Sequence, residues 1–444
     1  MSQSLSLNRK TGHRSANFVV LLCFVTIVAD GYDLIVYGST VPAILAFKEW
    51  AITPAQAGVI GSVALMGMLI GALTVGAVTD IWGRRKIMLV CIAWFSISMI
   101  ITSLAPNAEV FAMMRFVAGL GLGGVVPTAI ALTVEYSPKN RRQFNNALMY
   151  SGYFVGGILT ALLALALLPA TDFRVMYAIG AFPLVAVLPV AWRHLPESIV
   201  FLTAKSRQEE ARVLTEQYGI APRDIEPTPL PKSEKAVPDR LAGIRTLFHA
   251  RYLAGTMLFA AASFCGLLLV YGLNTWLPNI MKTAGYGLGS SLSFLLVLNC
   301  GAIIGTVVVS KVADKVGVKP VAIAGFIAAT GSVFALSANL PAAWLFAAVA
   351  VAGLGTGSQI LVNGFVATYY PDTSRATALG WSLGVGRIGA ILGPAIGGAV
   401  AASTLGYQWS FYVFSGFALL GALFIAFVPR RPAEIDSPLL HTHP

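Results

Sequence analysis

Long apolar runs recur along the whole chain, from Phe18 to Val428. A helix that crosses a bilayer needs about 20 predominantly apolar residues, and runs of that length are repeated here. Only 11% of the 444 residues are charged, against roughly a quarter in a soluble protein, so the charged residues are too few to solvate a globular surface of this size. The pattern therefore predicts an all-α membrane protein and argues against a large soluble one.

The apolar runs divide into about twelve membrane-spanning helices. We expect them near residues 17–45, 56–80, 87–105, 109–134, 144–168, 173–195, 252–280, 290–313, 320–338, 342–369, 376–402 and 407–428. One long polar segment separates the sixth helix from the seventh. It holds a charged stretch, Lys205 to Gln217, that predicts a short helix, and then a series of prolines from Pro222 to Pro238 that is typical of a linker. The expected domains are a six-helix half over residues 1–195, a cytoplasmic linker over 196–250, and a second six-helix half with a short tail over 251–444.

Basic residues gather in one alternating set of loops and termini, as at Arg84, Arg85 and Lys86, and are nearly absent from the opposite set. This asymmetry follows the positive-inside rule. We therefore expect a multi-pass protein of the bacterial inner membrane with both termini in the cytoplasm. The same distribution argues against a nucleic-acid-binding interpretation of the net charge of +11.

The two halves carry the same pattern at a constant separation of 234 residues, as from Gly67 to Gly301. The matched positions are Gly67 and Gly301, Gly71 and Gly305, Asp80 and Asp314, Gly83 and Gly317, Gly119 and Gly353, Gly121 and Gly355, and Gly123 and Gly357. One offset that joins several motifs indicates an internal duplication. Transporters are commonly built from such repeats, with substrate bound between them near the midplane of the bilayer.

Charged residues lie well inside the predicted helices at Asp30, Asp33, Arg115 and Arg387. A charge at the centre of a membrane helix costs roughly 3 kcal/mol on insertion scales, so packing alone gives no reason to keep two aspartates in one helix. Asp30 and Asp33 share a helical face, and neighbouring carboxylates in a low dielectric titrate as a coupled unit. All five histidines lie in termini, in loops or at a helix end, so carboxylates must carry any proton within the membrane. The alternative is salt bridging that orients the first helix.

No nucleophile–base pair, metal-ligand cluster or phosphate-binding loop is apparent in the sequence. The four cysteines lie within apolar runs and show no metal-site or disulfide spacing. We therefore expect a protein that is not an enzyme and that holds no cofactor or metal ion. The polar segment is too small for the signalling domain of a conventional receptor.

The turn after the second helix, Gly76-Ala-Val-Thr-Asp80-Ile-Trp-Gly83-Arg84-Arg85-Lys86, resembles the signature loop of the major facilitator superfamily. A weaker copy, Asp314-Lys-Val-Gly317-Val-Lys319, occupies the equivalent place in the second half. The resemblance spans essentially the whole chain. It implies a twelve-helix bundle of two pseudo-symmetric halves that works by alternating access.

Within that superfamily, Asp30-Gly31-Tyr32-Asp33 resembles the mark of the aromatic acid:proton symporters. The segment from Ala284 to Asn299 is similar to the benzoate carriers of that family. This resemblance implies proton-driven import of benzoate or a hydroxylated relative. The expected partners are a small aromatic carboxylate, protons and the lipid bilayer, and the expected state is a monomer.

An aromatic carboxylate needs a cation and flat apolar walls. Arg387 can hold the carboxylate by a bidentate contact. Arg115 can do the same, but it lies in the half that carries the aspartates, so we favour Arg115 for proton coupling and Arg387 for substrate. The other candidates for substrate contact are Tyr37, Tyr271, Asn274, Trp276, Asn299, Gln359 and Asn363. Taken singly, each is more often a packing or helix–helix hydrogen-bonding residue.

The signature loop predicts conformational machinery. The gating candidates are Gly76, Asp80, Gly83, Arg84 and Arg85, with Asp314 and Gly317 in the second half. Basic residues of the loop can pair with acidic helix ends in one access state and release them in the other. Glu135, at the end of the fourth helix, can pair with Arg84, Arg85 or Arg142 as part of proton coupling and gating, or it can be an ordinary charge at a helix end.

One pattern favours a different function. The sequence Gly389-Ala-Ile-Leu-Gly393-Pro394-Ala-Ile-Gly397-Gly398 has the form of the antiporter motif of drug exporters, although it lies in the eleventh helix rather than the fifth. We favour helix packing as the reason for these glycines. A proton-driven drug or metabolite exporter of the same superfamily is the alternative to the importer.

Overall fold

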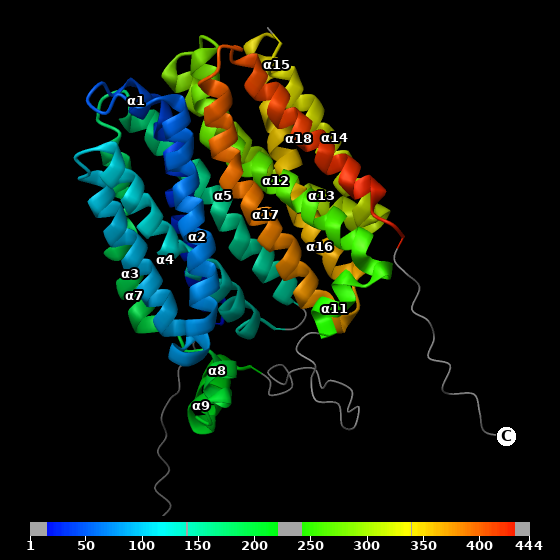
Figure 1. The fold of residues 1–444 in the computed structure, drawn as a ribbon. Helices are drawn as coiled ribbons and strands as arrows, with labels where there is room; N and C mark the ends of the chain where they lie inside the picture. The colour runs from blue at the N-terminus through cyan, green and yellow to red at the C-terminus, as the bar shows by residue number, and fades with distance from the viewer. Residues whose placement is uncertain (1–15, 139–140, 221–241, 339, 431–444) are drawn as a thin grey trace, which may run out of the picture. The chain divides into compact units, whose positions relative to one another are not determined.

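The computed structural model describes residues 16–138, 141–220, 242–338 and 340–430. Within these ranges the chain forms twelve helical spans long and apolar enough to cross a bilayer, and no strand (Figure 1). The prediction of an all-α membrane protein with twelve helices is confirmed. The chain divides into two compact units, Met1–Glu234 with Tyr286–Leu296, and Lys235–Gly285 with Val297–Pro444. The predicted boundaries at residues 195 and 250 stay predictions.

The first six spans come from the N-terminal part of the chain. They are α1 (Ala16–Ala46), α2 (Pro54–Trp82), α3 (Arg84–Ser103), α4 (Ala108–Glu135), α5 (Arg142–Leu167), and a sixth span made of α6 (Arg174–Gly180), the 3₁₀ turn η2 (Phe182–Leu184) and α7 (Val187–His194). Two short helices follow, α8 (Ile199–Ala204) and α9 (Gln208–Tyr218). The helix predicted for the charged stretch is present as α9, whereas the predicted proline-rich linker lies outside the described residues.

The other six spans begin after the short helix α11 (Ala242–Phe248). They are α12 (Ala250–Thr283), α13 (Leu288–Val316), α14 (Val318–Ala335), a tenth span made of α15 (Ala342–Gly357) and α16 (Gln359–Tyr369), α17 (Asp372–Ala401) and α18 (Gln408–Phe427).

Two spans are interrupted, which the sequence analysis did not predict. Pro183 lies in the turn that breaks the sixth span, and proline has no N–H with which to continue a helix. The tenth span is interrupted at Ser358. There the N–H of Ser358 bonds to the carbonyl of Gly355, and the N–H of Leu361 bonds to the carbonyl of Ser358, both at 3.0 Å. These bonds reach three residues back, so the helix tightens locally at this point.

Glycines allow close helix approach in the first unit. A side chain at Gly67 of α2 would collide with the carbonyl oxygen of Phe116 in α4, and one at Gly119 of α4 would collide with the carbonyl oxygen of Ala64 in α2. The two backbones are therefore in direct contact. Small residues at such crossings are the usual means of packing helices in a membrane.

The second unit repeats this contact between α13 and α15. A side chain at Gly301 would collide with the carbonyl oxygen of Ala350, and one at Gly353 would collide with the carbonyl oxygen of Leu298. Each of these positions lies 234 residues after its counterpart in the first unit. The internal duplication inferred from the sequence therefore extends to the atoms that meet at the helix crossing.

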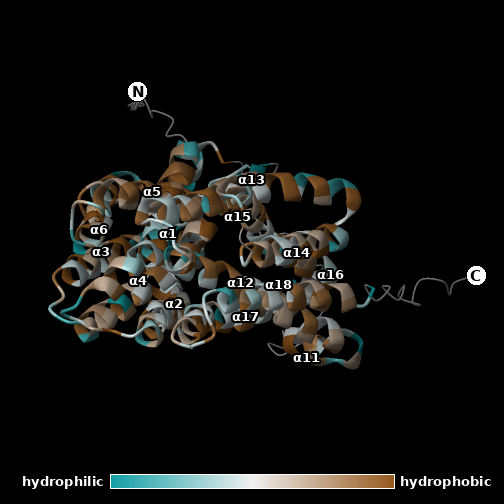
Figure 2. Cartoon of the chain, turned by 90° about the horizontal axis from the view of Figure 1, so that it is seen from above, coloured by the Kyte–Doolittle hydropathy of each residue, from teal (hydrophilic) through white to brown (hydrophobic). Residues whose placement is uncertain are grey.

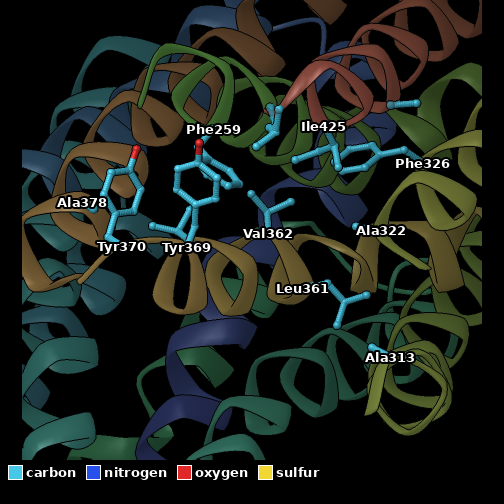
Figure 3. Close-up of a cluster of buried hydrophobic side chains, with 14 of the residues drawn as sticks. Phe259, Ala313, Ala322, Phe326, Leu361, Val362, Tyr369, Tyr370, Ala378 and Ile425 are labelled. Carbon is cyan, nitrogen blue, oxygen red and sulfur yellow. The ribbon is translucent and has the colours of Figure 1, made fainter. Parts of the chain in front are cut away.

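Large apolar side chains are exposed along the helices of both units, as contact with lipid requires. Figure 2 shows hydrophobic residues along much of the ribbon. Leu73 and Phe427, for example, are each 71% exposed. The interior of the second unit contains a cluster of buried hydrophobic side chains that includes Phe259, Tyr369 and Ile425 (Figure 3). A polar group buried in such a bundle therefore needs a partner or a function.

Candidate functional site

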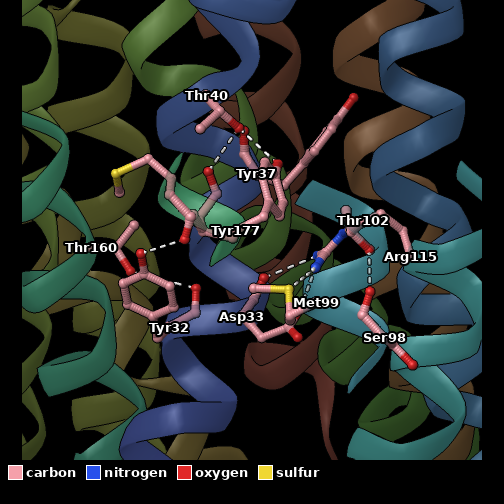
Figure 4. Close-up of polar contacts among 12 residues, drawn as sticks. Tyr32, Asp33, Tyr37, Thr40, Ser98, Met99, Thr102, Arg115, Thr160 and Tyr177 are labelled. Carbon is pink, nitrogen blue, oxygen red and sulfur yellow. Dashed lines mark hydrogen bonds and ion pairs between the residues drawn. The ribbon is translucent and has the colours of Figure 1, made fainter. Parts of the chain in front are cut away.

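A buried ion pair joins α1 to α4 inside the first unit (Figure 4). Nη1 of Arg115 donates to Oδ1 of Asp33, and Nη2 donates to the backbone carbonyl oxygen of Asp33 at 3.0 Å. Both residues are only 1% exposed. The structure thus brings Arg115 to one of the two aspartates that the sequence analysis associated with it, and their coupling role stays a prediction.

Aromatic rings lie beside this ion pair. The Arg115 guanidinium is 5.9 Å from the centroid of the Tyr177 ring of α6. The Tyr177 hydroxyl is hydrogen-bonded to the Thr40 hydroxyl at 2.8 Å (Figure 4). The Tyr37 hydroxyl donates to the carbonyl of Ala57 at 2.5 Å. These hydroxyl groups are therefore used in joining helices. Sequence reasoning missed Tyr177, because no motif or spacing marks it.

The ion pair leaves one donor and one acceptor unused. Among the described residues, neither Nε of Arg115 nor Oδ2 of Asp33 has a hydrogen-bond partner, and both atoms are buried. A buried polar atom without a partner costs about 1–3 kcal/mol, and more when it is charged. A carboxylate oxygen in this state can accept a proton, and a guanidinium N–H in this state can bind an anion.

Asp30 lies one helical turn from Asp33, on the same face of α1, and is also 1% exposed. Between them Gly31 packs directly on α5, because a side chain there would collide with the backbone of Tyr153. This close contact fixes the rotation of α1 about its axis. That rotation turns Asp33 toward α4.

A second polar network lies where α2 meets α3 and where α4 ends. Arg84 forms an ion pair with Glu135, and the Ser198 hydroxyl donates to Oε1 of Glu135 at 3.0 Å. Oε1 of Glu197 accepts the backbone N–H groups of Arg85 and Ser198, both at 2.9 Å. Of the three basic partners considered for Glu135, the structure pairs it with Arg84. Its role in gating or coupling stays a prediction.

The turn between α2 and α3 packs directly against Glu197 of this network. Gly83 has φ of +90°, a conformation that favours glycine, and a Cβ there would lie 2.5 Å from Oε2 of Glu197. The Tyr136 hydroxyl donates to the carbonyl of Glu197 at 2.7 Å. Burial raises the pKa of Tyr136, so this hydroxyl keeps its proton and remains a donor. The sequence analysis did not identify Glu197 or Ser198 as site residues.

The equivalent turn of the second unit is open. Gly317 has φ of +101°, but the atom nearest to a Cβ placed there is Cδ of Pro320, at 3.8 Å. Asp314 is exposed. Gly76 and Asp80 belong to α2, and their side chains lie outside the described part of the chain.

Three of the predicted substrate residues take part in helix packing in the second unit. Nδ2 of Asn299 in α13 donates to Oδ1 of Asn274 in α12 at 3.2 Å, and both residues are buried. The Trp276 ring of α12 is fully buried, and its N–H donates to the carbonyl of Pro394 in α17 at 2.8 Å. The structure therefore gives Trp276 a packing role and brings Asn274 and Asn299 together.

The remaining candidates are more scattered. Arg387 of α17 and Tyr271 of α12 are both half-buried. Gln359 and Asn363 lie in α16, and Gln359 is 7% exposed. Tyr37 belongs to the first unit, where its hydroxyl donates a hydrogen bond to the backbone carbonyl of Ala57.

Comparison with known proteins agrees with this architecture. The family described as Major Facilitator Superfamily matches residues 23–357 and 297–442. The fold is similar to a D-xylose–proton symporter, with a TM-score of 0.73 and 18% identity over 94% of this chain and 98% of that one. It is also similar to the xylose transporter XylE from E. coli, with a TM-score of 0.72 and 17% identity over 94% of this chain and all of that one. At these identities the structural likeness concerns the fold alone.

The sequence relatives are more informative. The benzoate transport protein of Acinetobacter baylyi is 36% identical, over 95% of this chain and 91% of that protein. The gentisate transporter of Corynebacterium glutamicum is 37% identical, over 97% and 90%. The gallate transporter of Pseudomonas putida is 32% identical, over 92% and 90%. This chain therefore belongs to the Major Facilitator Superfamily, as a membrane transporter in the branch of that family that holds these aromatic acid transporters.

Proposed function

We propose that the protein imports a monocyclic aromatic acid, benzoate or a hydroxybenzoate-like relative, together with a proton, by alternating access. The observation that carries this proposal is the buried Asp33–Arg115 pair with one unused acceptor and one unused donor. The substrate class is supported by the relatives, whose names give benzoate, gentisate and gallate as their cargo. The distribution of basic residues supports an inner-membrane protein with cytoplasmic termini, and a monomer is sufficient for the mechanism.

The ion pair offers a simple means of coupling. When Asp33 is ionised, it neutralises Arg115 inside the membrane. When Asp33 takes a proton, the Arg115 charge is left uncompensated in a low dielectric, which is costly. The additional positive charge then favours entry of an anion into the protein, so charge balance favours loading a proton and an anion together. Asp30 is the second carboxylate of the coupled unit and exchanges protons with Asp33.

The second unit is proposed to supply most of the contacts with the substrate itself. Arg387 is the proposed anchor for the carboxylate, with Arg115 as the alternative. Tyr271, Asn274, Asn299, Gln359 and Asn363 are the proposed neighbours of the ring. Because Tyr37 and Trp276 are committed to helix packing, we assign them support of the site rather than contact with the substrate.

The network around Arg84 and Glu135 is proposed to act as a gate. It ties the turn after α2 to the end of α4 and to the segment after α7. Interconversion of access states would require these contacts to break and reform. Gly83 lies in this turn, Asp80 near the end of α2 and Arg85 in the first turn of α3, so these three residues are proposed to set the rate of this step.

The glycine pattern of the eleventh helix, which supported the exporter alternative, has a packing explanation. A side chain at Gly389 of α17 would collide with the carbonyl oxygen of Phe264 in α12, and a Cβ at Gly393 would lie 2.6 Å from the carbonyl oxygen of Leu268. The pattern is thus accounted for by close contact of α17 with α12. It gives no independent support to export.

Flux in proteoliposomes tests the proposal. We expect labelled benzoate or 4-hydroxybenzoate to accumulate when the lumen is more alkaline than the medium, and a protonophore to abolish the accumulation. Equal uptake with and without the proton gradient would contradict proton coupling. Export of the acid driven by an inward proton gradient would favour the exporter. No flux of any aromatic acid would contradict the proposed substrate class.

A further inference from the structure

The interruption at Ser358 places two unpaired polar side chains in the apolar interior of the second unit. Among the described residues, neither Oε1 nor Nε2 of Gln359 has a hydrogen-bond partner, and neither does Oγ of Ser358. Gln359 is 7% exposed and Ser358 is fully buried. Leu361 and Val362, two and three residues after Gln359, belong to the apolar cluster of Figure 3.

Glycines and one aromatic ring surround these groups. A side chain at Gly266 of α12 would collide with Oε1 of Gln359, and one at Gly325 of α14 would collide with Oγ of Ser358. The Phe326 ring lies beside them, since a Cβ at Gly266 would be 3.2 Å from its Cζ atom. The amide, the hydroxyl and the ring therefore meet between α12 and α14, at positions where glycine leaves room for them.

The chemistry of these groups selects one kind of ligand. Gln359 offers both an unused acceptor and unused donors, and Ser358 offers a hydroxyl that can do either. A carboxylate only accepts hydrogen bonds, so it would meet Oε1 of Gln359 unfavourably. A phenolic hydroxyl donates and accepts, and its ring can pack against Phe326. An unpaired amide in an apolar bundle is costly, and a hydroxyl removes that cost only while it is bound.

We infer that Gln359 and Ser358 form hydrogen bonds with a hydroxyl group on the substrate ring, so that the preferred substrate of this protein is a hydroxylated benzoate rather than benzoate itself. This rests on the proposed function and narrows its substrate class. The hydroxyl reaches Gln359 when α16 moves away from Gly266. The interruption at Ser358 makes this movement possible, because α16 is joined to α15 as a separate short helix.

Uptake of benzoate and of 2-, 3- and 4-hydroxybenzoate, measured as kcat/KM in proteoliposomes, tests the inference. A site built to bond a hydroxyl rejects the analogue that lacks it, so we expect one hydroxy acid to be preferred over benzoate by about 10-fold or more. Gln359→Leu should lower kcat/KM for the hydroxy acid far more than kcat/KM for benzoate, so that the ratio approaches unity. Ser358→Ala should reduce the ratio by a smaller factor.

The matched control is Thr356→Val. Thr356 is buried near the same interruption, but its hydroxyl already donates to the carbonyl of Gly353 at 2.7 Å, so the variant should leave the ratio unchanged. The abundance of each variant in the membrane shows whether it folds. If Gln359→Leu fails to fold, Gln359→Asn is used in its place; it keeps the amide but shortens the side chain, and it should also lower the ratio. Transport of benzoate without preference for any hydroxy acid, or equal losses for both acids in Gln359→Leu, overturns this inference alone. Absence of transport of every aromatic acid overturns the proposed function as well.

Discussion

The two halves of the molecule share their helix packing and differ in their polar chemistry. Gly119 of α4 and Gly353 of α15 lie at equivalent positions of the repeat. A Cβ at Gly119 would collide with the carbonyl oxygen of Ala64 in α2, and a Cβ at Gly353 would collide with that of Leu298 in α13. The duplicated scaffold has thus kept the same backbone contact at this helix crossing. The charged residues Asp80 and Asp314, near the ends of their helices, follow the same symmetry, whereas the charged residues well inside the helices do not.

Asp33 and Arg115 correspond, 234 residues later, to Leu267 and Val349. In the other direction, Gln359 of the second half corresponds to Val125 of the first. Each half therefore places polar groups where the other half has apolar ones. The comparison indicates that packing positions are fixed by the repeat, whereas each half has acquired its own polar residues: a buried ion pair in the first, and side-chain amides with the cation Arg387 in the second.

The largest expected effect is loss of the ion pair. Asp33→Asn should abolish accumulation against a gradient, because the coupled carboxylate is gone, while counterflow exchange of labelled acid is retained. Leu267→Asn, at the equivalent position of the second half, should leave accumulation intact. Normal accumulation by Asp33→Asn, or loss in both variants alike, would remove the proposed asymmetry of the halves.

The partner of Asp33 sharpens the same test. Arg115→Gln leaves Asp33 as a buried unpaired charge, which costs about 3–5 kcal/mol, so less protein should reach the membrane. Asp33→Asn combined with Arg115→Gln removes both charges and should restore protein abundance without restoring accumulation. Quantitative immunoblots of membranes report abundance, and uptake reports function. If the double variant is no more abundant in the membrane than Arg115→Gln, the two charges do not stabilise each other in the folded protein.

The next effect concerns Arg387, whose counterpart in the first half is Tyr153. Arg387 lies on a face of α17 about 100° from the neighbouring Gly386, which packs on α12, so it is turned away from that helix. Losing a hydrogen bond to a charged group costs about 1.5–3 kcal/mol. Arg387→Ala should nearly remove binding of aromatic acids, and Arg387→Lys should weaken it less, because lysine keeps the charge but lacks the planar fork. Binding of benzamide, measured in parallel, should change little. Equal losses of affinity for acid and amide would indicate that Arg115, rather than Arg387, binds the carboxylate.

The duplicated glycines should respond alike. Gly119→Ala and Gly353→Ala each force a methyl group into a backbone contact, and overpacking of this kind costs about 1–3 kcal/mol. Gly380→Ala is the control, because no atom lies within 4 Å of a Cβ at that position of α17. Thermal unfolding in detergent should show similar decreases for the first two variants and none for the control. A large decrease in only one half would break the packing symmetry.

The sequence was sufficient for the helices and for the duplication, because both depend on hydropathy and on glycine spacing, which are local in the chain. It also restricted the partners of Arg115 to two aspartates, since so few charges lie within the helices. It could not choose Asp33 over Asp30, because that choice depends on how Gly31 rotates α1 against α5. The interruption at Ser358 was missed for a similar reason. No proline marks it, and the tighter turn arises in a run of glycines that is also compatible with a continuous helix.

The smallest expected effect compares the two equivalent turns. Gly83 and Gly317 both combine a positive φ with ψ near 150°, a region that only glycine adopts readily, so replacing either with alanine adds backbone strain of about 1–3 kcal/mol. Only at Gly83 does the added Cβ also meet a polar network, at Oε2 of Glu197, since the space around Gly317 is open. Strain common to both variants therefore cancels in the comparison, and the remaining difference reports displacement of Glu197. If that network governs exchange between access states, Gly83→Ala should slow transport several-fold more than Gly317→Ala, with equal binding of the aromatic acid in both. Equal rates would assign the network to stability alone, and a parallel loss of binding in Gly83→Ala would contradict a purely conformational role.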